Sequence, residues 1–157
     1  MGYAYTWYDA IPNGWRIAFG EQLSKDIKTA FKIDKKRNPK LKWKDAIFWT
    51  QIKEKWGGLR LYASATETIQ NVLGYYERIS ELYCIDCGAP ALYMTTGYIL
   101  PFCEKCFDGL DCYDHLKKNK KEYQSFKKEC KIKGENKKRF KPAPVVVESF
   151  FANKKEK

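Results

Sequence analysis

Four cysteines form two closely spaced pairs in the middle of the chain. Two residues separate Cys84 from Cys87, two separate Cys103 from Cys106, and fifteen lie between the pairs. Each Cys-x-x-Cys turn can place two sulfurs on one side of a tight bend, and two such turns facing each other form a closed tetrahedral zinc site. We therefore predict one structural Zn²⁺ bound by these four thiolates. Two disulfides, or four unlinked thiols, are the alternatives.

The residues around these pairs predict a small zinc ribbon. Gly88 follows the first pair at a point where such turns often need a positive φ. Residues 91–95 and 98–100 flank Thr96 and Gly97 as a short hairpin would. We predict that this ribbon, residues 84–107, packs on an α+β body formed by residues 1–83. Residues 108–157 would then form a basic C-terminal helix and tail.

The order expected in the body is helix, β-hairpin, helix. Apolar residues recur at helical spacing over residues 15–33, which indicates an amphipathic helix. Residues 46–55 and 59–63 are rich in strand-forming types and are joined by the turn sequence of residues 56–58. The fold class expected for the whole chain is therefore α+β.

A second helix is expected after the hairpin. Ser64 and Glu67 have the spacing of a capping box, and apolar residues then recur at helical spacing as far as Tyr83. This helix would run directly into Cys84. Its last turn would then carry the first pair of cysteines and join the metal site to the body.

The formal net charge of +11 is concentrated towards the C-terminal end. Residues 1–116 carry 15 Lys and Arg against 14 Asp and Glu, whereas residues 117–157 carry 15 against 5. We predict a weakly amphipathic, lysine-rich helix over residues 111–133 and a negatively charged partner for this segment. Basic residues also cluster at 32–44, where a solvated loop and an anion-binding face are the alternatives.

We expect two groups of basic side chains to bind that partner. Nucleic acid held by such lysines would be bound through its phosphates, with a steep salt dependence and little base readout. An acidic protein surface is a second alternative, and a solvated helix without a partner is a third. The residues are Lys117, Lys118, Lys120, Lys121, Lys127, Lys128 and Lys131 in the larger group, and Lys35, Lys36 and Arg37 in the smaller.

Nothing in the sequence predicts an enzyme. Four thiolates leave no open position on a metal for a reactive water. His115 is the only histidine, and neither a nucleophile elbow nor a phosphate-binding loop occurs. His115 and Cys112 have ligand-like spacing, but a second metal site would need two more ligands, so a surface histidine is the alternative. No apolar run is long enough to span a membrane, and no secretory signal is recognisable, so we expect a cytoplasmic protein with reduced cysteines.

Three stretches of the chain resemble a known group of proteins. They are residues 9–21 (DAIPNGWRIAFGE), 51–62 (QIKEKWGGLRLY) and 84–106, with CIDCGAP at its start and TGYILPFCEKC at its end. Together they resemble small uncharacterised proteins of phages and other bacterial mobile elements, over roughly residues 9–106. The resemblance implies metal binding by the four cysteines and, for a phage protein, the host cytoplasm as its location. It implies no enzymatic activity.

Small proteins of that setting often counter host defences, and some anti-CRISPR proteins bind zinc and occupy a surface of an RNA-guided nuclease. By this analogy we expect a non-enzymatic inhibitor that binds a host protein, such as a type II CRISPR nuclease, and blocks its binding of nucleic acid. The alternative is a sequence-nonspecific nucleic-acid-binding accessory protein that uses the basic C-terminal segment. Neither hypothesis involves a membrane.

Overall fold

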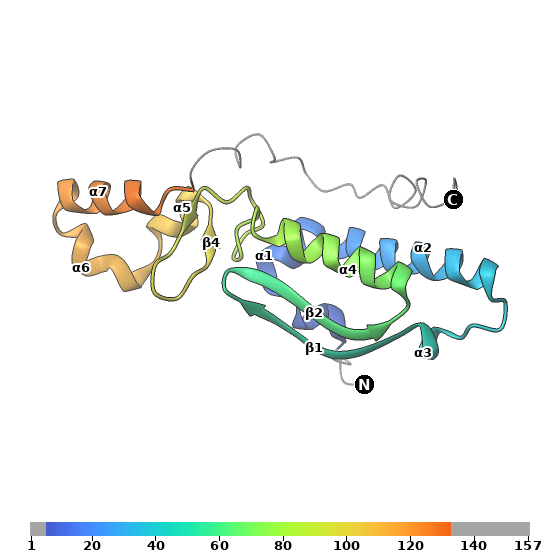
Figure 1. The fold of residues 1–157 in the computed structure, drawn as a ribbon. Coiled ribbons are helices and arrows are strands. Elements are labelled where there is room, and N and C mark those ends of the chain that lie inside the picture. Colours follow the sequence, from blue (N-terminus) through green and yellow to red (C-terminus); the bar gives the residue numbers. More distant parts are fainter. Residues whose placement is uncertain (1–5, 133–157) are drawn as a thin grey trace, which may run out of the picture.

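Helices and a β-hairpin form the larger of two lobes in the computed structural model (Figure 1). The four cysteines cluster at the junction with the smaller lobe, since the loop of Cys84 is hydrogen-bonded to Gly14 of the larger lobe and Cys84 belongs to the core of the smaller lobe. The structure describes residues 6–132. The expected basic tail beyond residue 132 therefore lies outside the described residues. Over the described part, the fold is α+β with an antiparallel hairpin and a cysteine cluster, as the sequence predicts.

A nearly continuous helical run opens the larger lobe. After the 3₁₀ turn η1 (Trp7–Ala10), it consists of α1 (Asn13–Trp15), the π-helical turn η2 (Arg16–Gly20) and α2 (Glu21–Arg37). The helix predicted over residues 15–33 is thus confirmed and extends further at both ends. Its apolar stripe is buried in the core of the lobe, through Trp15, Phe19, Leu23, Ile27 and Ala30.

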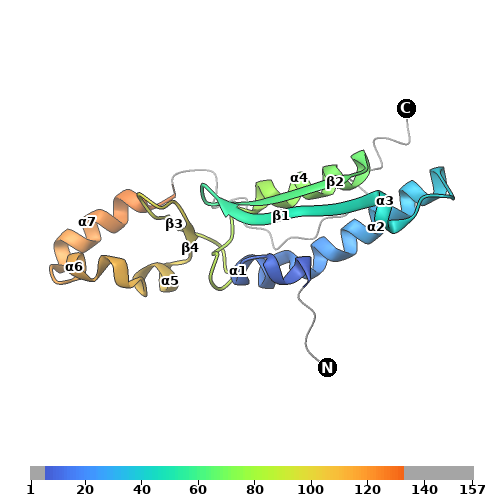
Figure 2. The ribbon, with the colours of Figure 1, turned by 90° about the horizontal axis from the view of Figure 1, so that it is seen from below.

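A long antiparallel hairpin follows the short helix α3 (Trp43–Ala46). Strand β1 (Ile47–Lys55) pairs with β2 (Gly58–Ala65), with Lys55 opposite Gly58 and an irregularity in register between Trp49 and Gln51. The predicted strands are therefore confirmed to within two residues. Helices α2 and α4 lie on one side of the hairpin, and no other described helix covers its opposite side (Figures 1 and 2).

Helix α4 (Glu67–Ser80) is attached to the free edge of β2. Ser80 Oγ accepts a hydrogen bond of 2.8 Å from the backbone N–H of Leu59, and Glu77 Oε1 accepts one of 2.7 Å from that of Leu61. These bonds satisfy backbone donors that an edge strand would otherwise leave unpaired. Two side chains of α4 thereby fix the position of the helix along β2.

Both predicted ends of this second helix are wrong by a few residues. The N-cap is Thr66, whose Oγ1 accepts a hydrogen bond of 3.3 Å from Ile69 N, because Ser64 is still part of β2. The helix ends at Ser80 and does not run into Cys84. A turn intervenes, so the first cysteine pair lies on a loop rather than on a helical turn.

The core of the larger lobe contains one buried carboxyl group. Asp26 of α2 accepts hydrogen bonds from Tyr76 Oη of α4 and, at 2.8 Å, from Gln22 Nε2. Burial raises the pKa of Asp26 above its usual value, although both hydrogen bonds act to lower it. The buried group is thus satisfied by partners from both helices, which fixes how α2 and α4 face each other.

The smaller lobe contains a short ribbon and a group of helices. Strands β3 (Tyr93–Met94) and β4 (Pro101–Phe102) pair antiparallel, which confirms a small hairpin between the cysteine pairs. Its second strand lies at residues 101–102 and not at the predicted residues 98–100. Helix α5 (Glu104–Asp108) follows directly. These elements surround a second core, made of Cys84, Tyr93, Phe102, Phe107, Tyr123 and Cys130.

The helix predicted over residues 111–133 is divided into three pieces. They are η3 (Asp111–Tyr113), α6 (Asp114–Lys117) and α7 (Lys120–Cys130). Asn119 interrupts the run because its side chain caps α7, where Oδ1 accepts a hydrogen bond of 3.2 Å from Glu122 N. Among residues 6–132, no helix is both long and apolar enough to cross a bilayer.

Candidate metal centre

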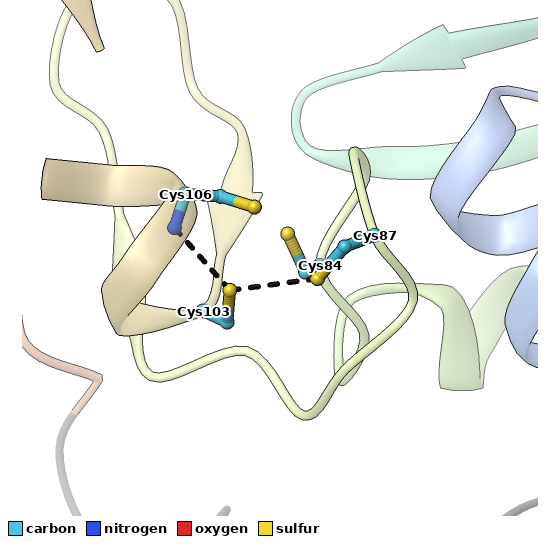
Figure 3. A group of neighbouring side chains, drawn as sticks. All are labelled: Cys84, Cys87, Cys103 and Cys106. Atoms are coloured by element: carbon cyan, nitrogen blue, oxygen red, sulfur yellow. Dashed lines mark hydrogen bonds between the residues drawn. The ribbon is translucent and has the colours of Figure 1, made fainter. Parts of the chain in front are cut away.

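The sulfur atoms of the four cysteines form a cluster between the two lobes. The Sγ atoms of Cys84, Cys87, Cys103 and Cys106 all lie within 4.8 Å of one another, and those of Cys87 and Cys103 are 3.5 Å apart (Figure 3). A tetrahedral ion with metal–sulfur bonds of about 2.3 Å would separate the sulfurs by about 3.8 Å. The observed spacing therefore suits a metal ion with four sulfur ligands.

A tight loop carries the first cysteine pair. Cys84 N donates to Ala89 O at 2.7 Å, and Gly88 N donates to Cys84 O at 3.0 Å. Gly88 has a φ of 81°, a conformation that side chains with a Cβ disfavour. The glycine predicted to be needed at this turn is therefore required by its backbone conformation.

Helix α1 holds this loop from the side of the larger lobe. Three of its hydrogen-bond donors reach backbone carbonyls around the first cysteine pair: Trp15 Nε1 donates to Tyr83 O at 3.0 Å, Gly14 N to Ile85 O at 2.7 Å, and Asn13 Nδ2 to Asp86 O at 3.3 Å. The first pair is thus fixed to the larger lobe by α1.

Two glycines allow these backbones to come so close. A Cβ on Gly14 would lie 2.2 Å from Cys84 O, and one on Gly88 would lie 2.6 Å from Gly14 O. Neither separation is compatible with a real side chain, and the obstructing atoms belong to the backbone. Close approach at this contact therefore depends on glycine at both positions.

The second cysteine pair lies at the start of α5. Cys103 is the N-cap, and its Sγ accepts a hydrogen bond of 3.4 Å from Cys106 N (Figure 3). Phe107 N donates to Cys103 O at 2.9 Å, which begins the helix, and the Phe107 side chain is fully buried in the second core. The helix start places both sulfurs on the side that faces Cys84.

Helix α7 fixes the position of α5 through a buried lysine. Lys127 Nζ lies 2.9 Å from carboxylate oxygens of both Glu104 and Asp108 on α5, and the side chain of Lys127 is only 7% exposed. Tyr123 Oη donates to Asp108 Oδ1 at 2.8 Å. Burial alone would lower the pKa of Lys127, but the hydrogen bonds to the two carboxylates raise it above its usual value. Lys127 is therefore held as a cation inside the smaller lobe.

Three thiols of the cluster have shifted pKa values. Burial raises the pKa of Cys84 and, together with hydrogen bonds among the neighbouring thiols, that of Cys106. Burial also acts to raise the pKa of Cys87, but the backbone N–H of Ala89 and the adjacent thiols stabilise its thiolate and lower the pKa. Four thiolates this close would repel one another, and a divalent cation among them removes that repulsion.

The site can therefore hold a metal ion through four protein ligands. All six cysteines of the chain are free thiols, so the structure does not support the disulfide alternative. A complete set of four thiolates is typical of structural rather than catalytic metal sites. Cys130 is buried in the second core, whereas Cys112 and His115 are exposed and lie outside the cluster.

Two of the predicted partner-binding lysines are engaged within the molecule. Besides Lys127, Lys117 Nζ donates to Asp108 O at 2.6 Å, to Leu110 O at 2.7 Å and to Asp114 Oδ1 at 3.2 Å. Both lysines have a structural role here, because their ammonium groups are occupied by contacts within the smaller lobe, and Lys127 is also buried. The five exposed members of the larger group are Lys118, Lys120, Lys121, Lys128 and Lys131.

The second predicted basic group lies far from the first. Lys35, Lys36 and Arg37 are exposed at the C-terminal end of α2, where their charge favours the helix dipole. Figures 1 and 2 show this end of α2 and the helices α6 and α7 at opposite ends of an elongated molecule. The two groups therefore do not form one continuous binding face.

Sequence reasoning missed the residues that support the cysteines from outside the loop. The Asn13 side chain donates to Asp86 O and accepts a hydrogen bond of 2.9 Å from Arg16, contacts that no sequence pattern indicated. Lys127 was assigned to a solvent-facing lysine group. No local pattern could reveal either partner, because both contacts join segments distant in the chain.

Comparison with known proteins adds no relationship to these observations. Searches against protein-family models, curated proteins and solved structures returned no match for this chain. The resemblance to proteins of phages and mobile elements is thus not supported by them, and the cysteine cluster is the part of that expectation that the structure does support.

We predict that Gly88→Ala weakens the cluster much more than Gly97→Ala does. Both glycines have a positive φ, so either alanine costs about 1–2 kcal/mol of backbone strain. Only at Gly88 does the new Cβ also meet a backbone atom, since nothing lies within 4 Å of the position at Gly97. The measurement is thermal unfolding together with metal retention against a competing chelator. Equal losses in the two variants would contradict the close contact with α1.

We also predict that Lys127→Ala destabilises the smaller lobe, whereas its neighbour Lys128→Ala does not. Removing the Lys127 ammonium leaves Glu104 and Asp108 without their cation, at an expected cost of about 1–2 kcal/mol because both carboxylates are partly exposed. Lys128 is exposed, so its removal should change the free energy of unfolding by less than about 0.5 kcal/mol. Chemical denaturation of the two variants measures the difference, and similar curves would refute the structural role of Lys127.

Proposed function

We propose that the four cysteines bind one Zn²⁺ as a structural ion and that the chain acts by binding a macromolecule rather than by catalysis. The observation that carries this proposal is the closed set of four sulfurs within 4.8 Å of one another. Zinc readily takes four thiolate ligands in tetrahedral geometry, and such a site has no position left for a substrate or a reactive water.

The ion would connect the two lobes. Cys84 and Cys87 are held by α1 of the larger lobe. Cys103 is the N-cap of α5 and Cys106 lies within that helix, which α7 supports. A zinc ion shared by both pairs would fix the ribbon in place. Structural zinc ions contribute about 10–16 kcal/mol of apparent binding free energy in small peptides, which is large compared with the stability of a small lobe.

The metal proposal predicts one Zn²⁺ per chain and a strong dependence on the cluster cysteines. Cys87→Ser removes one ligand and should weaken zinc binding by more than about ten-fold, because a serine hydroxyl is a poor substitute for a thiolate. Cys112→Ser makes the same atomic change at an exposed thiol outside the cluster and should leave zinc affinity unchanged. Zinc content by mass spectrometry and competition with a chromophoric chelator measure both. A chain that binds no metal, or equal affinity in the two variants, would refute the site.

Nucleic acid is the partner class that the surface of the smaller lobe supports best. Lys121 and Lys128 lie seven residues apart, and therefore on the same side of α7, opposite its buried residues Tyr123 and Lys127. None of the five exposed lysines of this group has an ion-pair partner among residues 6–132. Such a surface would bind phosphates with little sequence preference and with a steep dependence on salt.

The inhibitor hypothesis derives only from the sequence resemblance. It proposes that the chain binds a host RNA-guided nuclease, such as a type II CRISPR nuclease, and blocks its access to nucleic acid. No contact surface in the described residues favours one such target. A single capture experiment can separate it from the nucleic-acid proposal.

We predict that immobilised, zinc-loaded protein recovers nucleic acid from a bacterial lysate at low salt, and that nuclease treatment removes this material. Replacing Lys118, Lys121 and Lys128 by alanine should reduce recovery, whereas replacing Lys35, Lys36 and Arg37 changes the charge equally at the opposite end of the molecule and serves as the control. A stoichiometric protein band that survives nuclease treatment would favour the inhibitor hypothesis. Absence of nucleic acid even at low salt would reject the nucleic-acid proposal.

A further inference from the structure

The hairpin has one face that no other described element covers. Leu59 and Leu61 point from β2 into the core, so the residues that alternate with them point to the other side, away from α2 and α4. Figure 1 shows the hairpin below these helices, and Figure 2 shows its uncovered side from below. We call this side the outer face; its members are Phe48, Gln51, Lys53, Lys55, Arg60 and Tyr62.

Two aromatic side chains lie on the outer face. Phe48 is 69% exposed and Tyr62 is 40% exposed. Tyr62 is paired with Gln51 and Phe48 with Ser64, which makes the two aromatic residues diagonal neighbours on adjacent strands. Neither ring is needed to fill the core, because the core is built from the opposite face of the hairpin.

The charges of the outer face are all positive. Lys53 is paired with Arg60, and Lys55 follows on the same side towards the turn. The Lys53 and Lys55 side chains are exposed, whereas Arg60 is half-buried at the edge of β2, where it lines a hollow together with Glu77 and Glu81. Lys53 and Lys55 are therefore the available charges of this face. The nearest acidic residue of β1, Glu54, points to the other side, where it accepts hydrogen bonds from Gly57 N at 2.9 Å and from Tyr98 Oη at 2.8 Å.

The turn at the end of this face carries a third exposed aromatic residue, Trp56, which also borders a small pocket with Tyr98 and Ile99. Trp56 and Gly57 form the two-residue turn, and Trp56 has a φ of 56° although it is not a glycine. Turns of this type favour Asn, Asp or Gly at that position, and a bulky residue there costs stability. Because the Trp56 side chain is 68% exposed, burial in this chain does not offset the cost. A strained and exposed aromatic residue of this kind indicates a binding role.

We propose that the outer face and Trp56 bind single-stranded nucleic acid. Unpaired bases would stack on the rings of Phe48, Tyr62 and Trp56, and the phosphates between them would contact Lys53 and Lys55. Alternating aromatic and basic side chains along an exposed strand pair are typical of proteins that bind single strands without sequence preference. Paired bases offer no free faces for this stacking, which favours single strands over a duplex.

The size of the surface agrees with a short oligonucleotide. Phe48 and Trp56 are eight residues apart along the hairpin, which corresponds to about 26 Å at the rise of a β-strand. That length accommodates roughly four nucleotides of an extended strand. The inference shares with the proposed function only the assumption that the ligand is nucleic acid. The surface itself is distinct from the lysines of α6 and α7.

Fluorescence anisotropy of a labelled twelve-residue oligothymidylate, titrated with the zinc-loaded full chain, tests the proposal. Trp56→Asn is the decisive variant, because asparagine tolerates the positive φ and should maintain or raise the melting temperature while removing the ring. Binding should weaken by roughly ten-fold, within the range measured for loss of one stacked aromatic residue. Tyr62→Thr and Phe48→Thr, which preserve strand propensity, should each weaken binding similarly.

A charge-matched pair separates this face from general electrostatic attraction. Lys53→Ala with Lys55→Ala should weaken binding of the oligonucleotide, whereas Lys35→Ala with Lys36→Ala, which makes the same charge change, should not. Three outcomes would overturn the proposal. Binding could be insensitive to the aromatic and outer-face lysine variants, it could be tighter for a duplex than for a single strand, or polyglutamate could displace the oligonucleotide as readily as unlabelled single strands do.

Zinc content, measured on the same samples, keeps this test separate from that of the proposed metal site. Loss of single-strand binding in a variant that retains one zinc per chain assigns the effect to the outer face. If the unmodified chain retains zinc and binds no oligonucleotide, the outer-face inference fails while the metal site stands. If the unmodified chain retains no zinc after zinc loading but still binds the oligonucleotide, the metal proposal fails while the outer-face inference stands.

Discussion

The contact between α1 and the first cysteine loop is the constraint on which the arrangement of the molecule depends. Gly14 and Gly88 bring two backbones so close that no side chain fits between them, and three hydrogen bonds from α1 then fix the loop. Cys84 also belongs to the core of the smaller lobe. One short loop therefore carries half of the candidate metal ligands and connects the two cores.

Charge is distributed differently in the two lobes. In the smaller lobe, the ammonium groups of Lys117 and Lys127 bind to α5 and to the loop after it. These contacts hold α5, at whose start Cys103 and Cys106 lie. Exposed basic residues occur on α7, at the C-terminal end of α2, along α2 at Lys25 and Lys28, and on the outer face of the hairpin. Figure 2 shows that these elements extend over the whole length of the molecule. The formal charge of +11 is therefore spread over several separate surfaces and does not form one basic face that a single partner could contact.

Sequence patterns were sufficient for the elements whose signals are local. The apolar stripe from Phe19 to Ala30 predicted α2, and the paired Cys-x-x-Cys turns predicted the cluster, because spacing along the chain determines both geometries. The predicted start of the second helix was wrong. Serine is a common N-cap residue, but Ser64 pairs with Phe48 in the hairpin and therefore belongs to the strand.

Contacts between distant segments could not be predicted in the same way. Whether Lys127 is solvated or buried depends on α5, nineteen or more residues away in the chain, and the sequence around Lys127 resembles that around its exposed neighbours. The role of Gly14 was similarly hidden, because Asn-Gly is an ordinary turn sequence. What was missing is knowledge of which segments meet, and no single-sequence pattern contains it.

The irregularity of β1 has a consequence for how this chain can vary in length. Between Trp49 and Gln51 the strand has one more residue than its partner, so the alternation of side chains changes phase at Thr50. Deleting that one residue would restore a regular ladder with the same pairs, so Phe48 would stay on the outer face and Trp49 on the inner one. Deleting a residue from the regular part of either strand would instead move every side chain on one side of the deletion to the opposite face. Position 50 is therefore the place in β1 where the chain can lose a residue without exchanging the two faces of the hairpin.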